Sequence, residues 1–201
     1  MCIPASATSE VPLVAMHMDE ILDALPLQYC AFSSCFRRES GAAGRDTRGM
    51  FRVHQFQKVE MVVYTEPDKS WDEHERMLGI EESLVQELGI PYRVVNTAAG
   101  DLSAAAAKRY DIEGWFPSQE RYREITSTSN TTDYQSRRLD ARVRRESGLE
   151  PMHTLNGTAV TARAMLAVLE NFQDDRGEVA VPEALVEFGA PRRVGSAAVP
   201  G

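Results

Sequence analysis

The sequence predicts an α+β fold, in which an antiparallel β-sheet is flanked by helices. Two alternating apolar segments in the first third of the chain are joined by a long glycine-containing loop, which indicates an antiparallel hairpin. Later segments have helical or strand patterns without a regular βαβ alternation. Neither GxGxxG nor GxxxxGK[ST] occurs. We therefore expect any bound nucleotide to be held without a Rossmann or P-loop cradle.

The predicted hairpin occupies residues 28–65. Residues 28–36 alternate and carry three aromatic side chains, which favours a strand, and residues 51–65 are rich in β-branched and aromatic residues. Residues 37–50 between them contain three glycines among charged residues, which indicates a flexible loop. The loop is too long for a tight turn, and long loops are often functional.

Patterns in the rest of the chain predict further helices and strands. Ser70 can cap a helix that Gly89 ends. Helices are expected over 70–88, 103–109, 131–144 and 158–172, and strands over 92–96, 110–116, 121–127 and 152–156. We expect one domain over residues 1–189. Residues 190–201 are small, basic and rich in Pro and Gly, and are expected to be a disordered tail.

Composition is that of an ordinary globular protein, with 201 residues, 43% hydrophobic and 26% charged. The chain has no apolar stretch of about 18 residues and no signal-peptide pattern, so we expect a cytoplasmic protein without a membrane span. Three cysteines, Cys2, Cys30 and Cys35, fit no zinc spacing and are expected to be reduced thiols.

Charge argues against strong binding to a nucleic-acid backbone. The net charge is −8, whereas proteins that hold phosphate backbones are usually basic. The arginines cluster, however, at 37–52 and 137–145. The second cluster is interpreted as a solvated face, whereas the first could bind a triphosphate.

The hairpin itself suggests nucleotide chemistry. Arg37 ends one predicted strand and Arg52 begins the next, so a hairpin would bring the two guanidinium groups together, and such groups bind phosphate bidentately. Phe56 shares a sheet face with Arg52 and could be a platform for a base. Glu39 and Glu60 supply acceptors nearby. The alternative is a surface hairpin held together by salt bridges.

Several segments along the chain resemble the motifs of class II aminoacyl-tRNA synthetases. In detail they are similar to the motifs of the seryl-tRNA synthetase family. TSE resembles the serine-binding TxE loop, FRRE with GRDTRG and RVHQFQKVE resembles motif 2, and TLNGT with a following arginine resembles motif 3. These segments are, in order, 8–10, 36–39, 44–49, 52–60, and 154–158 with Arg163. The resemblance covers about residues 3–187 and implies a class II catalytic core with an antiparallel sheet.

The resemblance implies roles for particular residues in holding ATP. Arg37 and Arg163 would be catalytic, Glu39 would accept from the adenine amino group, and Phe56 would stack on adenine against Arg163. Arg52 would hold the γ-phosphate. The implied ATP-binding residues are Arg37, Arg38, Glu39, Arg52, Val53, Phe56, Glu124, Ile125, Thr126, Ser127 and Arg163.

Serine and a metal ion are implied in the same way. The residues that would surround serine are Thr8, Ser9, Glu10, Arg37, Glu60 and Thr158. Glu124 and Ser127 would hold Mg²⁺, a hard cation that prefers oxygen ligands, and no zinc is expected. The implied reaction is attack of the serine carboxylate on the α-phosphorus of ATP, followed by transfer of serine to the acceptor end of tRNA(Ser).

The chain also departs from the family pattern. The TxE segment follows Met1 almost at once, so we expect the N-terminal tRNA-binding arm and motif 1 to be missing, and with them the basis of the family's homodimer. Two alternatives remain, a shortened relative that loads a carrier protein and a non-catalytic remnant. Such relatives use a zinc site with cysteine ligands in place of the TxE loop, so Thr8 and Glu10 argue against the first. Intact Arg37, Glu60 and Arg163 argue against the second.

Overall fold

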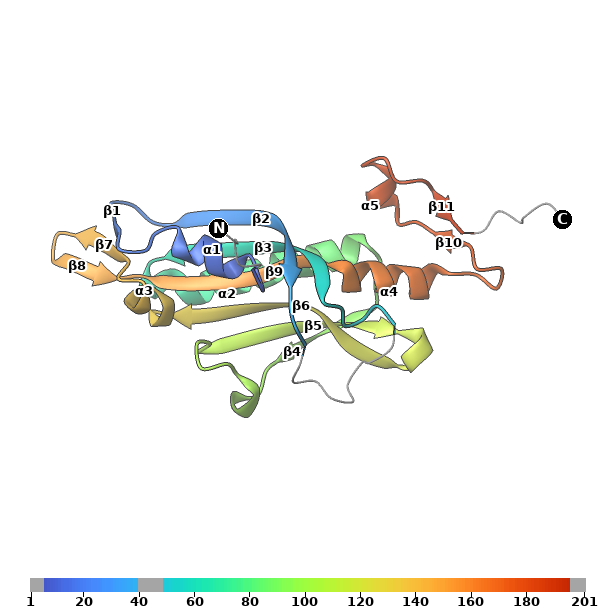
Figure 1. Cartoon of the computed structure of the whole chain (residues 1–201), viewed down its shortest axis with the longest axis horizontal. Helices are drawn as coiled ribbons and strands as arrows, with labels where there is room; N and C mark the ends of the chain where they lie inside the picture. Colours follow the sequence, from blue (N-terminus) through green and yellow to red (C-terminus); the bar gives the residue numbers. More distant parts are fainter. Residues whose placement is uncertain (1–5, 40–48, 196–201) are drawn as a thin grey trace.

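The computed structural model describes residues 6–39 and 49–195, and its centre is a six-stranded antiparallel sheet. The strand order is β2-β3-β9-β6-β5-β4 (Figure 1). In that order, the strands span Leu27–Phe36, Gln55–Thr65, His153–Thr161, Arg121–Thr132, Lys108–Phe116 and Tyr92–Asn96. The sheet confirms the predicted α+β class with an antiparallel sheet.

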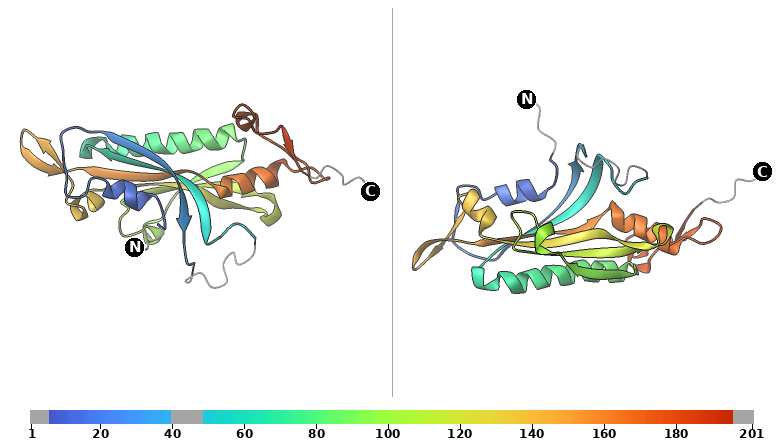
Figure 2. Two further views of the ribbon diagram at one scale, coloured as in Figure 1. Left: turned by 45° about the horizontal axis from the view of Figure 1, so that its top comes forward. Right: turned by 90° about the horizontal axis from the view of Figure 1, so that it is seen from below.

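Helices lie on both sides of this sheet. The long helix α2, Ser70–Glu87, runs along one face, and the short helix α1, Glu10–Ala15, lies over the opposite face (Figure 2). The remaining helices are α3 Tyr134–Arg138, α4 Ala162–Phe172 and α5 Glu183–Val186, with 3₁₀ turns at Pro67–Lys69, Ala99–Asp101 and Pro117–Gln119. None of the helices in the described ranges is both long and apolar enough to span a membrane.

Small strands complete the fold at its two ends. β1 Ile21–Leu22, β7 Arg142–Arg145 and β8 Gly148–Pro151 form one small sheet, and β10 Val179–Ala180 pairs with β11 Arg193–Val194. The pairing of Val194 with Val179 orders part of the segment that was expected to be disordered from residue 190 onward, and that expectation is wrong for residues 193–194. Residues 196–201 lie outside the described part of the chain.

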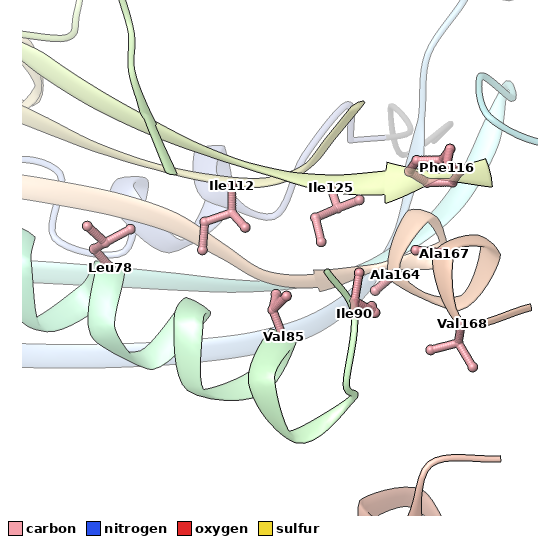
Figure 3. Packing of buried hydrophobic residues seen from close by; sticks show 9 residues of the cluster. All are labelled: Leu78, Val85, Ile90, Ile112, Phe116, Ile125, Ala164, Ala167 and Val168. Atoms are coloured by element: carbon pink, nitrogen blue, oxygen red, sulfur yellow. The ribbon is translucent and has the colours of Figure 1, made fainter. Parts of the chain in front are cut away.

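The main core joins α2, the sheet and α4. Leu78 and Val85 of α2 pack against Ile112 and Ile125 of the sheet, and Ala167 of α4 closes the cluster (Figure 3). These side chains are almost completely buried. Burial of apolar surface, at about 25 cal/mol per Å², fixes α2 behind the strands that carry the site.

Three sequence-predicted helices differ from the structure. The expected helix over 103–109 is absent, and β5 begins at Lys108 instead. The expected helix over 131–144 shrinks to α3, because β6 runs on to Thr132 and the chain turns at Asp140, where φ is +50°. The expected helix over 158–172 begins only at Ala162, with Thr161 accepting a hydrogen bond at its N-terminus.

The third difference matters for the site, because it puts Thr158 on strand β9. Thr158, Val160 and Thr161 are β-branched, and such side chains favour a strand over a helix. The strand expected over 51–65 likewise begins only at Gln55, and residues 51–54 form bends. Residues 40–48 of the predicted loop lie outside the described residues.

A β-bulge in β6 sets the direction of several polar side chains. Ile112 pairs with Thr126 and Glu113 pairs with Glu124, so Ile125 has no partner in β5. In a regular strand, residues three apart point to opposite faces. The extra residue, Ile125, lies in the core, and Glu124 and Ser127 both face the cavity described next.

Candidate active site

A cavity of about 460 Å³ opens above the sheet. Helix α1, whose first residue lines the cavity, lies on the face of the sheet opposite α2 (Figure 2). Strands β3, β6 and β9, the start of α1 and the start of α4 supply its walls. Of the residues expected to bind ATP, serine or metal, these line the cavity: Thr8, Glu10, Arg37, Glu39, Arg52, Val53, Phe56, Glu60, Glu124, Ile125, Thr126, Ser127, Thr158 and Arg163. Segments up to 155 residues apart thus meet in one place, as the resemblance implies.

Arg38 and Ser9 do not line the cavity. The backbone N–H of Arg37 donates to the carbonyl of His54 and so continues the hairpin ladder. The side chain of Arg38, the next residue, points outward and is exposed. Ser9 is 4% exposed and lies beneath the first turn of α1. The expected contacts of these two residues with ATP and serine are therefore not supported by their positions.

Several arginines line the cavity. The Nε atom of Arg37 donates to the carbonyl of Ala7 at 3.2 Å, and its guanidinium lies 5.0 Å from the ring centre of Phe56. Arg52 forms an ion pair with Glu39. The guanidinium of arginine can form two parallel hydrogen bonds with a carboxylate or with a phosphate. A phosphate group would therefore compete with Glu39 for Arg52.

Arg163 contacts an aromatic side chain that lines the cavity. Its guanidinium lies 4.6 Å from the ring centre of Phe51, and its Nη1 atom donates to the carbonyl of Glu124 at 3.0 Å. Arg123 lies 3.8 Å from the same ring. The bends before β3 leave Phe51 outside the strand alternation, so its ring reaches across to α4. Phe51 was not among the expected site residues.

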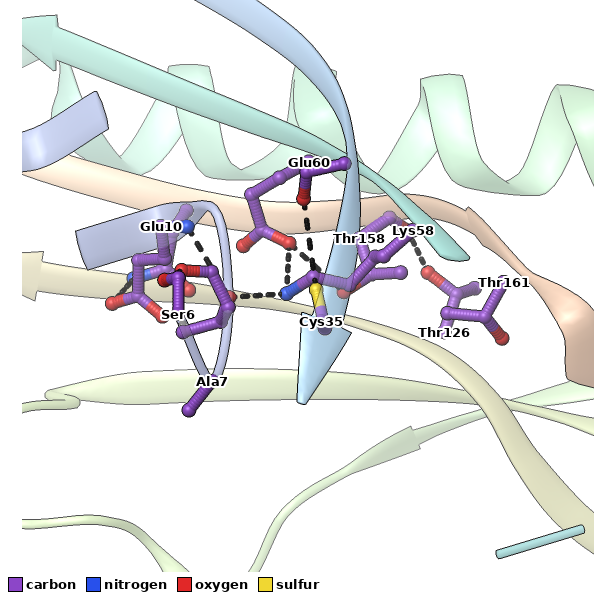
Figure 4. A network of polar contacts seen from close by, with 12 residues as sticks. Ser6, Ala7, Glu10, Cys35, Lys58, Glu60, Thr126, Thr158 and Thr161 are labelled. Carbon is purple, nitrogen blue, oxygen red and sulfur yellow. Dashed lines mark hydrogen bonds and ion pairs between the residues drawn. The ribbon is translucent and has the colours of Figure 1, made fainter. Parts of the chain in front are cut away.

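A buried ion pair also lines the cavity (Figure 4). Lys58 and Glu60 are 6% and 2% exposed, and Lys58 also donates to the hydroxyl of Thr8 at 2.6 Å. Thr158 donates to Glu60 at 3.4 Å. Burial raises the pKa of Glu60, although the positive charge of Lys58 acts in the opposite direction.

Glu10 is held by two amide side chains. Its Oε1 atom accepts from Gln135 at 2.8 Å and from Asn156 at 3.0 Å. The amide oxygen of Gln135 accepts from the hydroxyl of Thr154 at 2.7 Å, so its NH₂ group must face Glu10. A hydrogen-bonded chain from α3 therefore fixes the carboxylate at the mouth of the cavity.

The sequence analysis missed several residues of the site. Lys58 could have been found, because Phe56, Lys58 and Glu60 alternate on one strand face. Gln135 and Asn156 gave no such signal, since their contacts with Glu10 span 125 and 146 residues of sequence. Phe51 and Arg109, which also line the cavity, were likewise not predicted.

The oxygen atoms of Glu124 and Ser127 suit Mg²⁺, which commonly takes one or two protein carboxylates and completes its shell with water and phosphate oxygens. The side chain of Glu124 is 42% exposed and lies 3.1 Å from Arg109 and 3.7 Å from Arg163. No group of three or more His, Cys, Asp or Glu side chains among the described residues could hold a metal by itself. The pair therefore fits a metal that arrives with a phosphate ligand.

A cavity lined by both arginines and carboxylates, laid on a six-stranded antiparallel sheet, fits the catalytic core of class II aminoacyl-tRNA synthetases. Residues 5–172 match the family tRNA synthetase class II core domain (G, H, P, S and T), and the chain belongs to this family.

Its relatives include serine–tRNA ligases. The chain is 55% identical to the Pyrococcus furiosus serine–tRNA ligase over 186 residues, which is 90% of this chain and 41% of the relative. It is 56% identical to the Thermobifida fusca serine–tRNA ligase over 184 residues, 90% of this chain and 44% of the relative. The chain thus spans less than half the length of these relatives.

Solved structures give the same result. Seryl-tRNA synthetase from Pyrococcus horikoshii, complexed with ATP, superposes with a TM-score of 0.91 at 49% identity, over 94% of this chain and 44% of that one. The cytoplasmic serine–tRNA ligase of Naegleria fowleri, in complex with AMP, superposes with a TM-score of 0.89 at 45% identity, over 96% of this chain and 46% of that one.

Proposed function

We propose that this chain is the catalytic core of a serine–tRNA ligase, which uses ATP to convert L-serine to seryl-adenylate. The observation that carries the proposal is one cavity whose lining includes both Arg37, Phe56 and Arg163 and the carboxylates of Glu10 and Glu60. A triphosphate and an amino acid require opposite charges, and this cavity offers both within one volume.

The proposed chemistry needs positioning and charge neutralisation and no protein nucleophile. The serine carboxylate would attack the α-phosphorus in line, and pyrophosphate would leave. Arg37 would neutralise charge on the α-phosphate and the attacking carboxylate, while Arg52 and Arg163 would hold the outer phosphates. Phe56 would stack on the adenine, whose amino group would donate to Glu39.

Glu124 and Ser127 would hold Mg²⁺ against the phosphates. The ion would supply neutralisation of the phosphate charge, and the bulge at Ile125 is what allows both side chains to face it. Arg109, which now lies beside Glu124, would have to share that carboxylate or release it.

Selection of serine would come from polar groups of the pocket that the serine hydroxyl satisfies and that the methyl group of alanine leaves unpaired. Glu60 is 2% exposed and Thr158 donates to it, so the serine hydroxyl would enter a buried polar pocket. Alanine would leave these groups without a partner, which is the kind of discrimination that reaches factors of about 10⁴. Glu10 and Thr8 would face the serine ammonium.

The transfer step is proposed for the longer protein. We propose tRNA(Ser) as acceptor of the seryl group, a cytoplasmic location, and a homodimer of the kind that the family forms. The segment GRDTRG, expected near the acceptor end, lies outside the described residues. Charging of tRNA and dimer formation can therefore be tested separately from serine activation.

Serine-dependent exchange of pyrophosphate into ATP tests the activation step. We expect exchange with L-serine and none above background with L-alanine, in a sample whose folded state is verified by circular dichroism and whose mass is measured by light scattering. A folded sample that shows no exchange with serine would reject the proposal. Exchange without charging of tRNA(Ser) would limit this chain to the activation step.

Phe51 offers a test of the nucleotide end. Replacing Phe51 by leucine removes the ring on which Arg163 and Arg123 rest but keeps an apolar side chain. Cation–π contacts contribute about 0.5–1 kcal/mol each at exposed sites, so we expect the KM for ATP to rise about fivefold. The KM for serine should stay constant. An equal rise in both constants would show general damage, not loss of support for Arg163.

A further inference from the structure

Glu81 is a buried carboxyl group beneath the cavity floor. It lies on α2, on the sheet face opposite the cavity, and is 0% exposed. Neither of its oxygen atoms has a hydrogen-bond partner by distance and angle among the described residues. A Cβ atom added to Gly157 of strand β9 would lie 2.7 Å from Oε1 of Glu81, so the carboxyl group sits directly behind that glycine.

The hydroxyl groups nearest to this carboxyl have already used their hydrogens. Thr126 donates to the carbonyl of Thr158, and Thr128 donates to the carbonyl of Asn156 at 3.2 Å. A hydroxyl has one hydrogen and two acceptor lone pairs, so both threonines can only accept from Glu81. An ionised carboxylate has nothing to donate, so neither of its own oxygen atoms would have a partner here, whereas a neutral carboxyl can donate its O–H to a threonine oxygen.

The charges around Glu81 favour the same state. Burial raises its pKa well above the usual value, the carboxylates of Glu60 and Asp111 act in the same direction, and the Thr126 hydroxyl and Arg109 oppose them. His74, two turns earlier on α2, donates from Nε2 to the carbonyl of Thr128 at 3.1 Å. Burial lowers the pKa of His74, so this ring adds no positive charge that could hold a carboxylate.

The two carbonyls that receive these hydroxyls flank Gly157, and the side chains of the same two residues face the cavity. Asn156 donates to Glu10 at 3.0 Å, and Thr158 donates to Glu60 at 3.4 Å. Glu81 is therefore linked through two hydroxyls and one strand to both carboxylates at the amino-acid end.

We propose that Glu81, as a neutral carboxylic acid, is a positioning residue that holds the Asn156–Gly157–Thr158 segment in the shape the amino-acid pocket requires. Its O–H would donate to the oxygen of one of the threonines that fix this segment, and Gly157 provides the space that the carboxyl group fills. The inference rests on the proposed function, because it takes the ligand of this pocket to be serine.

Two substitutions in the full chain separate this role from simple packing. Glu81→Gln keeps a donor of nearly the same shape, and Glu81→Leu fills the space without one. We expect Glu81→Gln to bind serine within about twofold of the parent chain, and Glu81→Leu to bind it about tenfold more weakly, as for one lost buried hydrogen bond. Calorimetric titrations with serine and, separately, with ATP measure these affinities. We expect the affinity for ATP to be unchanged in both Glu81→Gln and Glu81→Leu. Glu87→Leu on the exposed side of α2 is the matched control.

Loss of ATP affinity together with serine affinity in Glu81→Leu, or serine affinity unchanged in that variant, would overturn the positioning role. Equal losses in Glu81→Gln and Glu81→Leu would overturn it as well. A folded parent chain that binds ATP but not serine would reject the proposed function and the positioning role with it. That outcome differs from the others because it concerns the parent chain.

The neutral state has its own readout, which needs no ligand. Because the folded pKa of Glu81 is raised, its contribution to stability is fully present below the unfolded pKa and is lost as the pH rises through the folded value. Glu81→Gln lacks this dependence. We expect its free energy of unfolding in urea to rise relative to the parent between about pH 5 and about pH 8. A difference that is constant over this range would contradict a neutral Glu81.

Discussion

Arg37→Ala is expected to abolish serine-dependent pyrophosphate exchange. Arg37 lies at the end of β2, where its guanidinium is held by the carbonyl of Ala7 at 3.2 Å and by the ring of Phe56 at 5.0 Å. A preorganised cation at the reacting phosphate stabilises the transition state, and removal of one such group typically reduces the rate about 10²–10³-fold. Arg37→Lys should recover little, because an ammonium cannot form two parallel hydrogen bonds.

Arg93→Ala is the matched control for this loss. Arg93 is another strand arginine, but it lies on β4 at the far edge of the sheet, where it pairs with Glu113 at 2.6 Å. We expect exchange and folding to be unchanged in this variant. If the Arg37→Ala variant exchanged pyrophosphate at a rate within about threefold of the parent, a transition-state role for Arg37 would be excluded. A loss that small is far less than the loss expected for such a group. The neighbouring Arg38→Ala tests the cavity geometry, and exchange should persist there.

The hairpin end of the site was predictable from local spacing. Strand alternation puts Phe56 and Glu60 on one face, and a hairpin brings Arg37 opposite that strand whatever the rest of the chain does. The same rule would have given Lys58. Glu81 also left a signal, because it lies three residues after Leu78 and four before Val85, on the buried side of α2.

Contacts between distant strands were not predictable in the same way. Glu124 and Ser127 are three residues apart, and strand alternation alone would separate them. Only the bulge at Ile125, which depends on the register with β5, turns both to the cavity. Thr158 was expected in a helix, because apolar spacing continues from α4 back toward it. Thr158 lies in strand β9 because it pairs with Glu60 of β3. Such pairing between distant segments cannot be read from local spacing.

The polar contacts behind the site show why spacing is insufficient there. Gln135 reaches Glu10 only because β6 continues to Thr132 and shortens the expected helix to α3. Amide and hydroxyl side chains of this kind occur throughout the chain, and their sequence context is that of ordinary turns and strands. The resemblance to the synthetase family pointed to the arginines that we propose to be catalytic, whereas the groups that hold Glu10 and Glu60 in place emerged from the structure.

Lys58→Met is expected to reduce both stability and serine activation. The substitution keeps the length of the side chain but removes the cation that pairs with Glu60, which is 2% exposed. Breaking a buried ion pair on one side typically costs about 3–5 kcal/mol, because the remaining charge is left uncompensated. We expect the free energy of unfolding to fall by about 3 kcal/mol near neutral pH. Lys69→Met, at a side chain that is 64% exposed, is the control and should change little.

The pH dependence identifies the cause of that loss. The pKa of Glu60 is already raised by burial and is lowered by Lys58, so Lys58→Met should raise it further. An acid with a raised folded pKa contributes its stability below the unfolded pKa and loses it as the pH rises. The destabilisation should therefore be smaller in acid than at neutral pH. Adding Glu60→Gln to Lys58→Met should restore stability without restoring exchange, because a neutral amide needs no cation but lacks the carboxylate that would accept a hydrogen bond from the serine hydroxyl. If the double variant exchanged serine as the parent does, the Glu60 carboxylate would have no part in binding it.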